Sequence, residues 1–192
     1  MTWKTAKLGE ILARQKNLIE IDDDKEYKLV TVKLYHKGVT LRKVATGKEL
    51  SARKMHAVKA GEFILSGIDA RHGAFGIIPA ELEGAVVSND FWCLSFDENL
   101  IEKKFFLRLT STSFFDDLCK KASDGTTNRV RLQAEKFFNL EIPLPPLEEQ
   151  QRIVKKFHLI DQIADELTRQ SAFLEQLRSA VFSEAIDGQI IF

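Results

Sequence analysis

Residues 143–154, Pro-Leu-Pro-Pro-Leu-Glu-Glu-Gln-Gln-Arg-Ile-Val, divide the chain into two parts of different character. Proline fixes φ and lacks an N–H group, so the prolines of this stretch end an extended segment and suit the first turn of a helix. The two glutamates that follow favour the positive end of a helix dipole. No further Pro or Gly occurs before Gly188, a typical helix stop. The stretch therefore predicts one long helix over residues 147–188.

One face of this helix is predicted to be apolar, because its apolar residues recur at alternating steps of three and four, the heptad pattern of a coiled coil. The small domain before the helix cannot bury a seam of that length, and the sequence predicts no second long helix. We therefore expect a partner, either a second copy of the chain or another protein. Gln170 either fixes the register of that pairing or lies at its exposed edge. The predicted dimerisation residues are Ile153, Ile160, Ile163, Leu167, Gln170, Leu174, Leu177 and Val181.

The residues before the long helix predict a β-rich domain. Residues 27–35 alternate in polarity and are rich in β-branched and aromatic side chains, which favours a strand, and further short apolar runs are separated by Gly, Asp, Pro and Asn. Apolar residues at helical spacing predict helices over residues 5–20 and 101–121, and we assign the phenylalanines of the second to the core. A short helix is expected from about Gln133. The predicted fold class is α+β, a β-rich domain followed by one long coiled-coil helix.

The composition is that of a folded protein. The 192 residues are 44% hydrophobic, which is enough for a packed core. No run approaches the roughly 18 apolar residues of a membrane span, and no signal-like segment opens the sequence, so we interpret the protein as cytoplasmic. Cys93 and Cys119 are too few and too far apart to indicate a disulfide framework or a metal site.

The formal net charge of zero hides an uneven distribution. Residues 25–79 carry 11 Lys and Arg against 4 Asp and Glu, whereas residues 80–119 and 148–192 are net acidic. Two interpretations remain open. The charges mix on a solvated surface once the chain folds, or the basic block forms one face that binds a polyanion.

Motifs for catalysis are missing from the sequence. It contains no Walker loop, no glycine-rich methyltransferase loop and no Gly-x-Ser-x-Gly elbow. Residues 102–104 match the Glu-x-Lys of some nucleases, but the nearest upstream acid, Asp97, lies in the same short stretch and no Pro-Asp precedes it. We expect no enzymatic activity from this chain. A small nuclease and a coiled-coil adaptor without DNA affinity remain the alternatives.

Residues 138–154, FNLEIPLPPLEEQQRIV, resemble the junction between the recognition domain and the long helix in specificity subunits of type I restriction-modification systems. Residues 174–178 and 184–188 are similar to that helix and its end, and residues 58–66 and 68–79 resemble one subgroup of the family. A typical member has two recognition domains and two long helices, whereas this sequence shows one of each. It therefore resembles a half subunit, or a piece of a longer protein.

The resemblance implies a DNA target recognition domain over residues 1–146, a conserved dimerisation and spacer helix over 147–188, and a tail over 189–192. In this family the domain binds double-stranded DNA while DNA methyltransferase subunits modify an adenine with S-adenosylmethionine, and a restriction and translocase subunit joins for cleavage. This chain would hold no cofactor of its own. A homodimer formed through the helix would read a palindromic site interrupted by a spacer.

Recognition of DNA requires positive charge for the phosphates and Arg, Lys, Asn or His side chains in loops for the base edges. The alternative for Arg71 is a structural pair with Asp69 or another nearby acid. The expected DNA-binding residues are Lys33, Lys37, Arg42, Lys43, Arg53, Lys54, Arg71, His72, Asn128, Arg129 and Arg131.

Overall fold

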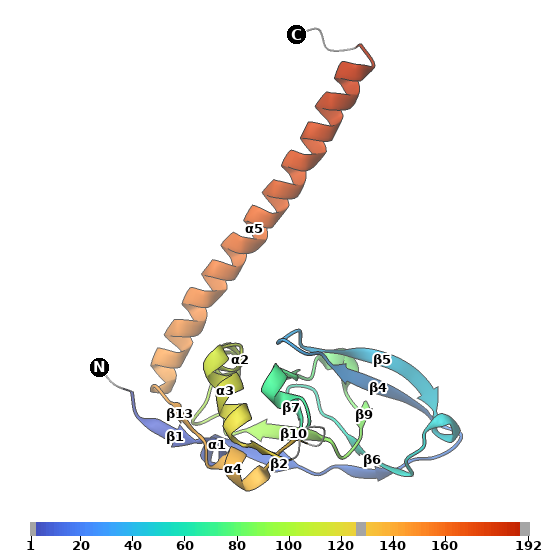
Figure 1. Ribbon diagram of the computed structural model, residues 1–192, viewed down its shortest axis with the longest axis vertical. Helices are drawn as coiled ribbons and strands as arrows, with labels where there is room; N and C mark the ends of the chain where they lie inside the picture. Colours follow the sequence, from blue (N-terminus) through green and yellow to red (C-terminus); the bar gives the residue numbers. More distant parts are fainter. Residues whose placement is uncertain (1–2, 126–129, 189–192) are drawn as a thin grey trace. The chain divides into compact units, whose positions relative to one another are not determined.

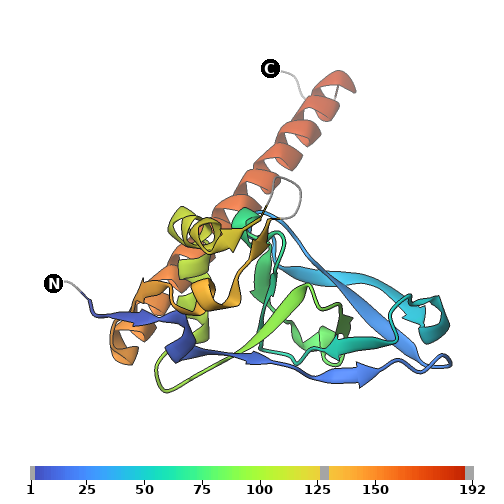
Figure 2. The same cartoon turned by 60° about the horizontal axis from the view of Figure 1, so that its bottom comes forward.

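The computed structural model describes residues 3–125 and 130–188, and Figures 1 and 2 show its secondary structure from two directions. The chain forms two compact units, residues 1–150 and residues 151–192. The first unit contains all the described strands and the short helices, and the second consists of most of the long helix. The functional boundaries proposed at residues 146 and 188 stay predictions.

Two sheets form the framework of the first unit in the described residues. The four-stranded sheet consists, in spatial order, of β2 (Leu12–Gln15), β10 (Phe91–Phe96), β7 (Phe63–Ser66) and β8 (Phe75–Ile77). The five-stranded sheet consists of β3 (Leu18–Glu20), β6 (Lys54–Ala57), β9 (Val86–Val87), β4 (Glu26–Val32) and β5 (Val39–Thr46). Two shorter ladders pair β1 (Thr5–Lys7) with β13 (Glu141–Pro143), and β11 (Ser123–Asp124) with β12 (Arg131–Leu132).

Helices and single turns connect these strands. The α-helices are α1 (Leu8–Ile11), α2 (Lys103–Thr110), α3 (Ser113–Lys121), α4 (Ala134–Phe138) and α5 (Leu147–Ile186). The 3-10 turns are η1 (Gly47–Glu49), η2 (Ala70–His72) and η3 (Ala80–Leu82). The predicted fold class is confirmed, since a sheet-rich domain precedes one long helix.

A cluster of phenylalanines joins the four-stranded sheet to the helices. Phe106 of α2 meets Phe63 of β7 edge to face, with ring centroids 5.1 Å apart. Phe115 of α3 meets Phe75 of β8 at 5.3 Å and Phe106 at 5.8 Å. Phe63, Phe106 and Phe115 are fully buried. Edge-to-face pairs add to the free energy gained by burial, so this cluster fixes how α2 and α3 lie on the sheet.

The helix predicted over residues 5–20 is wrong. Only α1 is helical, and the chain then enters β2, whose residues pair with β10. The spacing of Leu8 and Ile11 was a true helical signal, since both are fully buried, but pairing with a central strand decides the conformation from Leu12 onward. Gly9 lets α1 approach α4 closely: a Cβ at this position would lie 3.1 Å from the carbonyl oxygen of Phe138.

The single helix predicted over residues 101–121 is two helices. The chain breaks at residues 111–112, where hydroxyl groups compete for the backbone carbonyls. The Ser111 and Thr112 hydroxyls donate to the carbonyls of Leu107 and Leu109, at 2.8 Å and 2.6 Å. The assignment of the phenylalanines to the core is confirmed, except that Phe114 is exposed.

The other predicted elements are confirmed with small shifts. The strand expected over residues 27–35 is β4, but its last residues form a turn instead. The short helix expected near Gln133 is α4, which follows that residue directly. The helix expected over residues 147–188 is α5, which ends at Ile186.

Gln150, in the first turn of α5, is a fully buried polar side chain whose hydrogen bonds are satisfied. Its amide nitrogen donates to the carbonyls of Leu100 and Pro145 at 2.9 Å and 2.8 Å, and its oxygen accepts from the backbone N–H of Glu102 at 2.8 Å. One amide thereby connects the start of α5, the proline segment and the segment before α2. A buried polar group that loses its partner is costly, so this connection is specific.

We expect Gln150→Ala to lower the free energy of unfolding by about 3 kcal/mol, because it leaves one N–H and two carbonyls without a partner in the interior. Gln151→Ala, at the exposed neighbouring position, should change it by less than about 0.5 kcal/mol. Urea unfolding of both variants measures the difference. Equal midpoints would show that water replaces the missing hydrogen bonds.

Candidate DNA interface

The turn between β4 and β5, residues 33–38, is held in an uncommon backbone conformation. Tyr35 and His36 have φ values of 60° and 58°, in the left-handed region that favours glycine. Such residues cost about 1–3 kcal/mol each and persist where the surroundings impose them. The Tyr35 side chain is 69% exposed, so packing of this ring does not explain the conformation. Strained turns of this kind are common in functional sites.

The contacts that impose this conformation come from η2 and α3. The N–H groups of Tyr35 and His36 donate to the carbonyls of His72 and Gly73 at 2.9 Å and 3.0 Å. The His36 ring lies 2.9 Å from a carboxylate oxygen of Asp116 on α3. Gly73 allows this approach, since a Cβ there would lie 2.7 Å from the His36 ring nitrogen. The turn and η2 therefore form one surface.

Arg71 joins a third segment to this surface. Its guanidinium donates to the carbonyl oxygens of Ile68 at 2.9 Å and of Val130 at 3.1 Å. Its Nε lies 3.1 Å from a ring nitrogen of His72. The structural role considered for Arg71 thus involves backbone carbonyls, whereas it forms no ion pair with Asp69 within the described part of the chain. Arg71 holds the segment that enters β12 against η2.

Arg131 follows in that segment and forms an ion pair with Asp90. The backbone supports the arrangement, because the Leu132 N–H donates to the carbonyl of Gly67 at 2.7 Å. The structure therefore brings Lys37, Arg71, His72 and Arg131 together from three loops, although they are far apart in sequence. Asn128 and Arg129 were also predicted to bind DNA and lie outside the described residues.

Lys33, Arg42 and Lys43 extend the basic surface along the hairpin. All three are exposed, and none forms an ion pair with another described residue. The ladder pairs Leu29 with Lys43 and Val30 with Leu41, so Arg42 is the extra residue of a β-bulge. A bulge redirects a side chain and twists its strand, which distinguishes Arg42 from its neighbours on β5.

The structure does not bring Arg53 and Lys54 to this surface. They lie at β6, which neighbours the edge strand β3, whereas β5 forms the opposite edge of the same sheet. Arg53 forms an ion pair with Asp23, and the Lys54 ammonium lies 3.4 Å from a carboxylate oxygen of Glu20. Exposed pairs of this kind contribute little to stability, but they reduce the net charge offered to a phosphate.

Tyr35 is a candidate residue that the sequence analysis missed. It was placed at the end of a strand, although the Gly38 that follows was a signal for a turn. Asp116 was missed as well, because nothing in a helical sequence shows which loop a carboxylate will contact. Both become visible only when η2 and α3 are seen to hold the turn.

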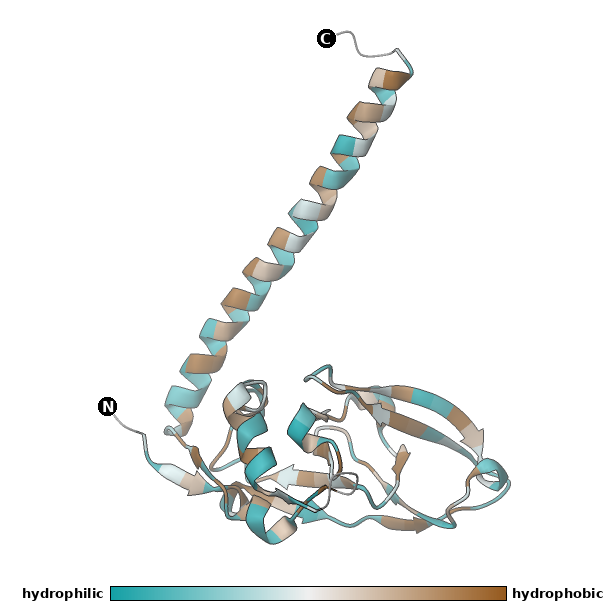
Figure 3. Cartoon of the chain, viewed as in Figure 1, coloured by the Kyte–Doolittle hydropathy of each residue, from teal (hydrophilic) through white to brown (hydrophobic). Residues whose placement is uncertain are grey.

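The helix α5 carries the second candidate surface. Figure 3 shows apolar segments recurring between polar ones along it. The predicted dimerisation residues are mostly exposed in the single chain, from 42% at Val181 to 62% at Ile163. Several apolar residues beside the seam are exposed too, including Leu159 and Phe173. Ile153 is partly buried.

The two cysteines are not candidate nucleophiles, because their thiols are buried. Both are buried, and burial raises the pKa of Cys93 to about 12 and also raises the pKa of Cys119. Thiolate is the reactive form, so both thiols are unreactive near neutral pH.

Within the described residues, no group of three or more His, Cys, Asp or Glu side chains is arranged so that it could hold a metal ion. No helix among them is long and apolar enough to cross a membrane.

The fold defines the class of protein: an α+β domain with a basic surface built from loops, which continues into one long helix. The chain belongs to the type I restriction modification DNA specificity domain family, whose model matches residues 1–175. The resemblance seen at the proline junction is thereby confirmed.

Individual relatives agree with this family. The chain is 26% identical over 190 residues to the type I restriction enzyme HindI specificity subunit of Haemophilus influenzae, covering 94% of this chain and 40% of that protein. The fold matches an HsdS subunit from Thermoanaerobacter tengcongensis with a TM-score of 0.70 and 21% identity, over 93% of this chain and 47% of that one. It matches an S subunit from M. genitalium with a TM-score of 0.55 and 14% identity, over 96% and 46%. The chain spans less than half the length of these relatives.

We expect Tyr35→Gly to leave the free energy of unfolding unchanged or to raise it by up to about 1 kcal/mol, because glycine adopts a positive φ without strain. A control glycine at Lys37, whose φ is not positive, should lower it by about 0.5–1 kcal/mol. Urea unfolding compares the two. A larger decrease at position 35 than at 37 would show that the Tyr35 ring stabilises the fold.

Proposed function

We propose that this chain is a DNA-specificity element of a type I restriction-modification complex and reads one half-site. The observation that carries the proposal is the surface formed by the 33–38 turn, η2 and residues 130–131, called here the reading surface. Three loops meet there around a strained, exposed turn, and cations come from each loop. Binding residues are commonly placed on loops that a rigid framework positions.

The candidate residues divide by their surroundings. Lys37, His72 and Tyr35 have side chains exposed at the reading surface and suit contact with base edges. Asn128 and Arg129, which lie outside the described residues, stay predicted DNA-binding residues from the sequence alone. Exposed cations along the hairpin suit contact with phosphates, namely Lys33, Arg42 and Lys43.

Arg71 and Arg131 already have protein partners and would bind DNA with their remaining donors. Arg53 and Lys54 contribute least.

Pairing through α5 completes the proposed function. A helix of 40 residues that exposes an apolar seam is stable only against another long helix. A second copy of the chain would supply that helix, and its two-fold symmetry would present identical reading surfaces to identical half-sites. The target would be a palindrome interrupted by a spacer, and the length of the helix pair would set the spacer.

Catalysis belongs to partners in this proposal. DNA methyltransferase subunits would modify an adenine with S-adenosylmethionine, and a restriction and translocase subunit would cleave. The fold also matches a chain from a structure that describes complex assembly and conformational transition of the type I R-M system, with a TM-score of 0.68, 20% identity and coverage of 96% of this chain and 48% of that one. The alternative function is a coiled-coil adaptor without DNA affinity, favoured only by the exposed seam.

Co-expression of the chain with its methyltransferase subunits, followed by genome-wide sequencing of methylated bases, tests the reading function. We expect one bipartite palindromic motif. A Lys37→Gln, His72→Gln variant should reduce methylation of that motif and weaken duplex binding about tenfold, because a charged and a neutral hydrogen bond are removed. Lys25→Gln, an exposed lysine paired with Asp22, is the charge-matched control.

Each alternative predicts a different result. An assembled complex that methylates no defined motif would overturn the proposal. If the chain is a coiled-coil adaptor without DNA affinity, it should show no salt-dependent binding of duplex oligonucleotides. If the chain is a small nuclease, the purified chain should cleave DNA with a divalent metal alone.

Changes to the seam test the pairing. Leu167→Asp together with Leu174→Asp should abolish the dimer measured by sedimentation, whereas Thr168→Asp, on the face beside the seam, should not.

Insertion of a seven-residue heptad into the helix adds about 10 Å to its length. It should lengthen the methylated spacer by about three base pairs while leaving both half-sites unchanged. An unchanged spacer would contradict the role of the helix pair as a ruler.

A further inference from the structure

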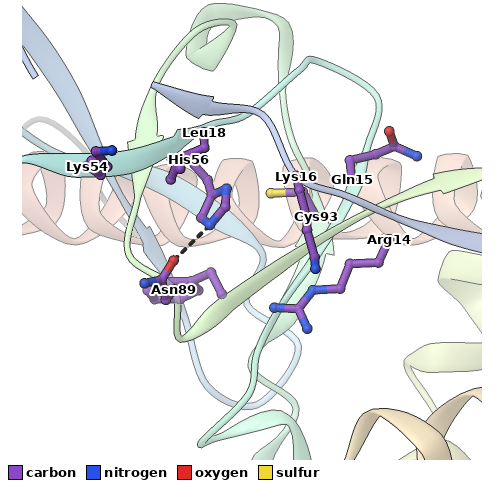
Figure 4. A pocket seen from close by; sticks show the side chains of 9 residues that line it. Arg14, Gln15, Lys16, Leu18, Lys54, His56, Asn89 and Cys93 are labelled. Atoms are coloured by element: carbon purple, nitrogen blue, oxygen red, sulfur yellow. Dashed lines mark hydrogen bonds between the residues drawn. The ribbon is translucent and has the colours of Figure 1, made fainter. Parts of the chain in front are cut away.

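A pocket of about 420 Å³ opens in the first unit where the chain passes from β2 to β3, beside β6 and the start of β10 (Figure 4). Its volume lies within the range of small-molecule sites. Its lining residues come from three separate segments of the sequence, residues 14–18, 54–56 and 89–93. Apart from Lys54, none of them was a predicted site residue, and the reading surface does not include them.

The lining of this pocket is positively charged. Arg14, Lys16 and Lys54 contribute three cations, and no carboxylate lines the pocket. Glu20 partly neutralises Lys54, but neither Arg14 nor Lys16 forms an ion pair with any described residue. Two cations in one pocket without a counter-charge repel each other, and an anion would relieve that repulsion.

Arg14 is held in position without using its hydrogen-bond donors. Its guanidinium carbon lies 4.5 Å from the centroid of the Trp92 ring, which orients it by a cation–π contact. No acceptor among the described residues receives a hydrogen bond from it. Partial burial lowers the pKa of Arg14, so its positive charge is held at some cost in solvation. A planar donor group held in this way suits an oxyanion such as phosphate.

Polar groups lie across the pocket from Arg14 and Lys16 (Figure 4). Figure 4 shows the His56 ring and Asn89 facing each other, and the ring Nε2 lies 2.8 Å from the Asn89 side-chain oxygen. The other ring nitrogen of His56 is buried and has no hydrogen-bond partner among the described residues. Gln15 is engaged elsewhere, because its amide donates to the Ser95 hydroxyl at 2.7 Å.

The remaining lining is apolar. Phe91 is half-buried, and the Leu18 side chain is 52% exposed. Burial keeps the Cys93 thiol protonated, with its pKa raised to about 12, so it adds no negative charge near neutral pH. A lining that combines cations, amides and apolar carbon matches a phosphate joined to a sugar or a base.

The pocket is also connected to the reading surface. Asn89 precedes Asp90, which forms the ion pair with Arg131. The backbone of Asp90 accepts a hydrogen bond from the Gly67 N–H at 2.6 Å, next to the loop that carries η2. Residues 89 and 90 thus link the pocket to the reading surface along the chain.

We propose that this pocket binds the phosphate of a nucleotide, with Arg14 and Lys16 as donors and Phe91 in contact with the attached sugar or base. Two sources share this chemistry, a phosphate of bound DNA or a free nucleotide. Binding of a DNA phosphate rests on the proposed function, whereas binding of a free nucleotide does not.

The test measures binding of inorganic phosphate, of deoxythymidine monophosphate and of a 20-base-pair duplex to the purified chain by calorimetry. We expect the Arg14→Gln, Lys16→Gln variant to bind the mononucleotide about a hundredfold more weakly, because two charge-assisted hydrogen bonds disappear. Arg14→Lys should bind with an affinity between those of the unaltered chain and the double variant, since it keeps the charge but loses the planar donor group. Lys25→Gln should bind like the unaltered chain. Lys16→Gln alone decides the test if substitution of Arg14 impairs folding.

The duplex arm distinguishes the two sources. If the pocket holds a DNA phosphate, the slope of log affinity against log salt concentration falls by about 1 for each phosphate that the variant no longer neutralises. If only mononucleotide binding weakens, the pocket takes a free nucleotide. Unchanged affinity for all three probes in folded variants would overturn the proposal. Failure of the Lys37 and His72 variants to affect DNA would count against the reading surface alone, because the mononucleotide arm is independent of it.

Discussion

The contact of Phe115 with Phe75 and Phe106 is the constraint on which the candidate interface depends. It seats α3 on the four-stranded sheet, and the next residue along the helix, Asp116, thereby meets His36. His36 and the backbone of η2 then hold the 33–38 turn in a conformation that it would not adopt alone. An apolar core thus determines, through one carboxylate, where an exposed loop lies. The strain in the turn is offset by packing free energy gained elsewhere.

The sequence predicted those features whose signals are local. The prolines and the long stretch without glycine identified α5, and the spacing of the phenylalanines identified the core. Residues 5–20 were misassigned because their apolar spacing fits a helix, while pairing with β10 imposes a strand from Leu12. The break at residues 111–112 depends on hydroxyl groups that bond to carbonyls one turn back. Such competition is hard to weigh without coordinates.

The candidate interface was predictable in composition but not in arrangement. The basic block of residues 25–79 suggested a polyanion, and the structure divides it: the hairpin cations stay free of ion pairs with described residues, whereas Arg53 and Lys54 are paired with acids. Arg14 and Lys16 lie outside the block, and only folding brings them to a pocket with His56 and Asn89. Counts along a sequence cannot show which charges will meet, because the contacts that decide it are between segments far apart.

The left-handed backbone at Tyr35 has a consequence for how such a domain diversifies. The turn is fixed by main-chain hydrogen bonds and by His36, so the exposed side chain at position 35 can be exchanged without rebuilding the scaffold. The positive φ nevertheless restricts the exchange, since glycine, asparagine and aspartate tolerate it far better than β-branched residues do. Few types of amino acid are therefore tolerated at this position, and most of them are small and polar. Backbone geometry, rather than the ligand, sets the range of variants available there to selection.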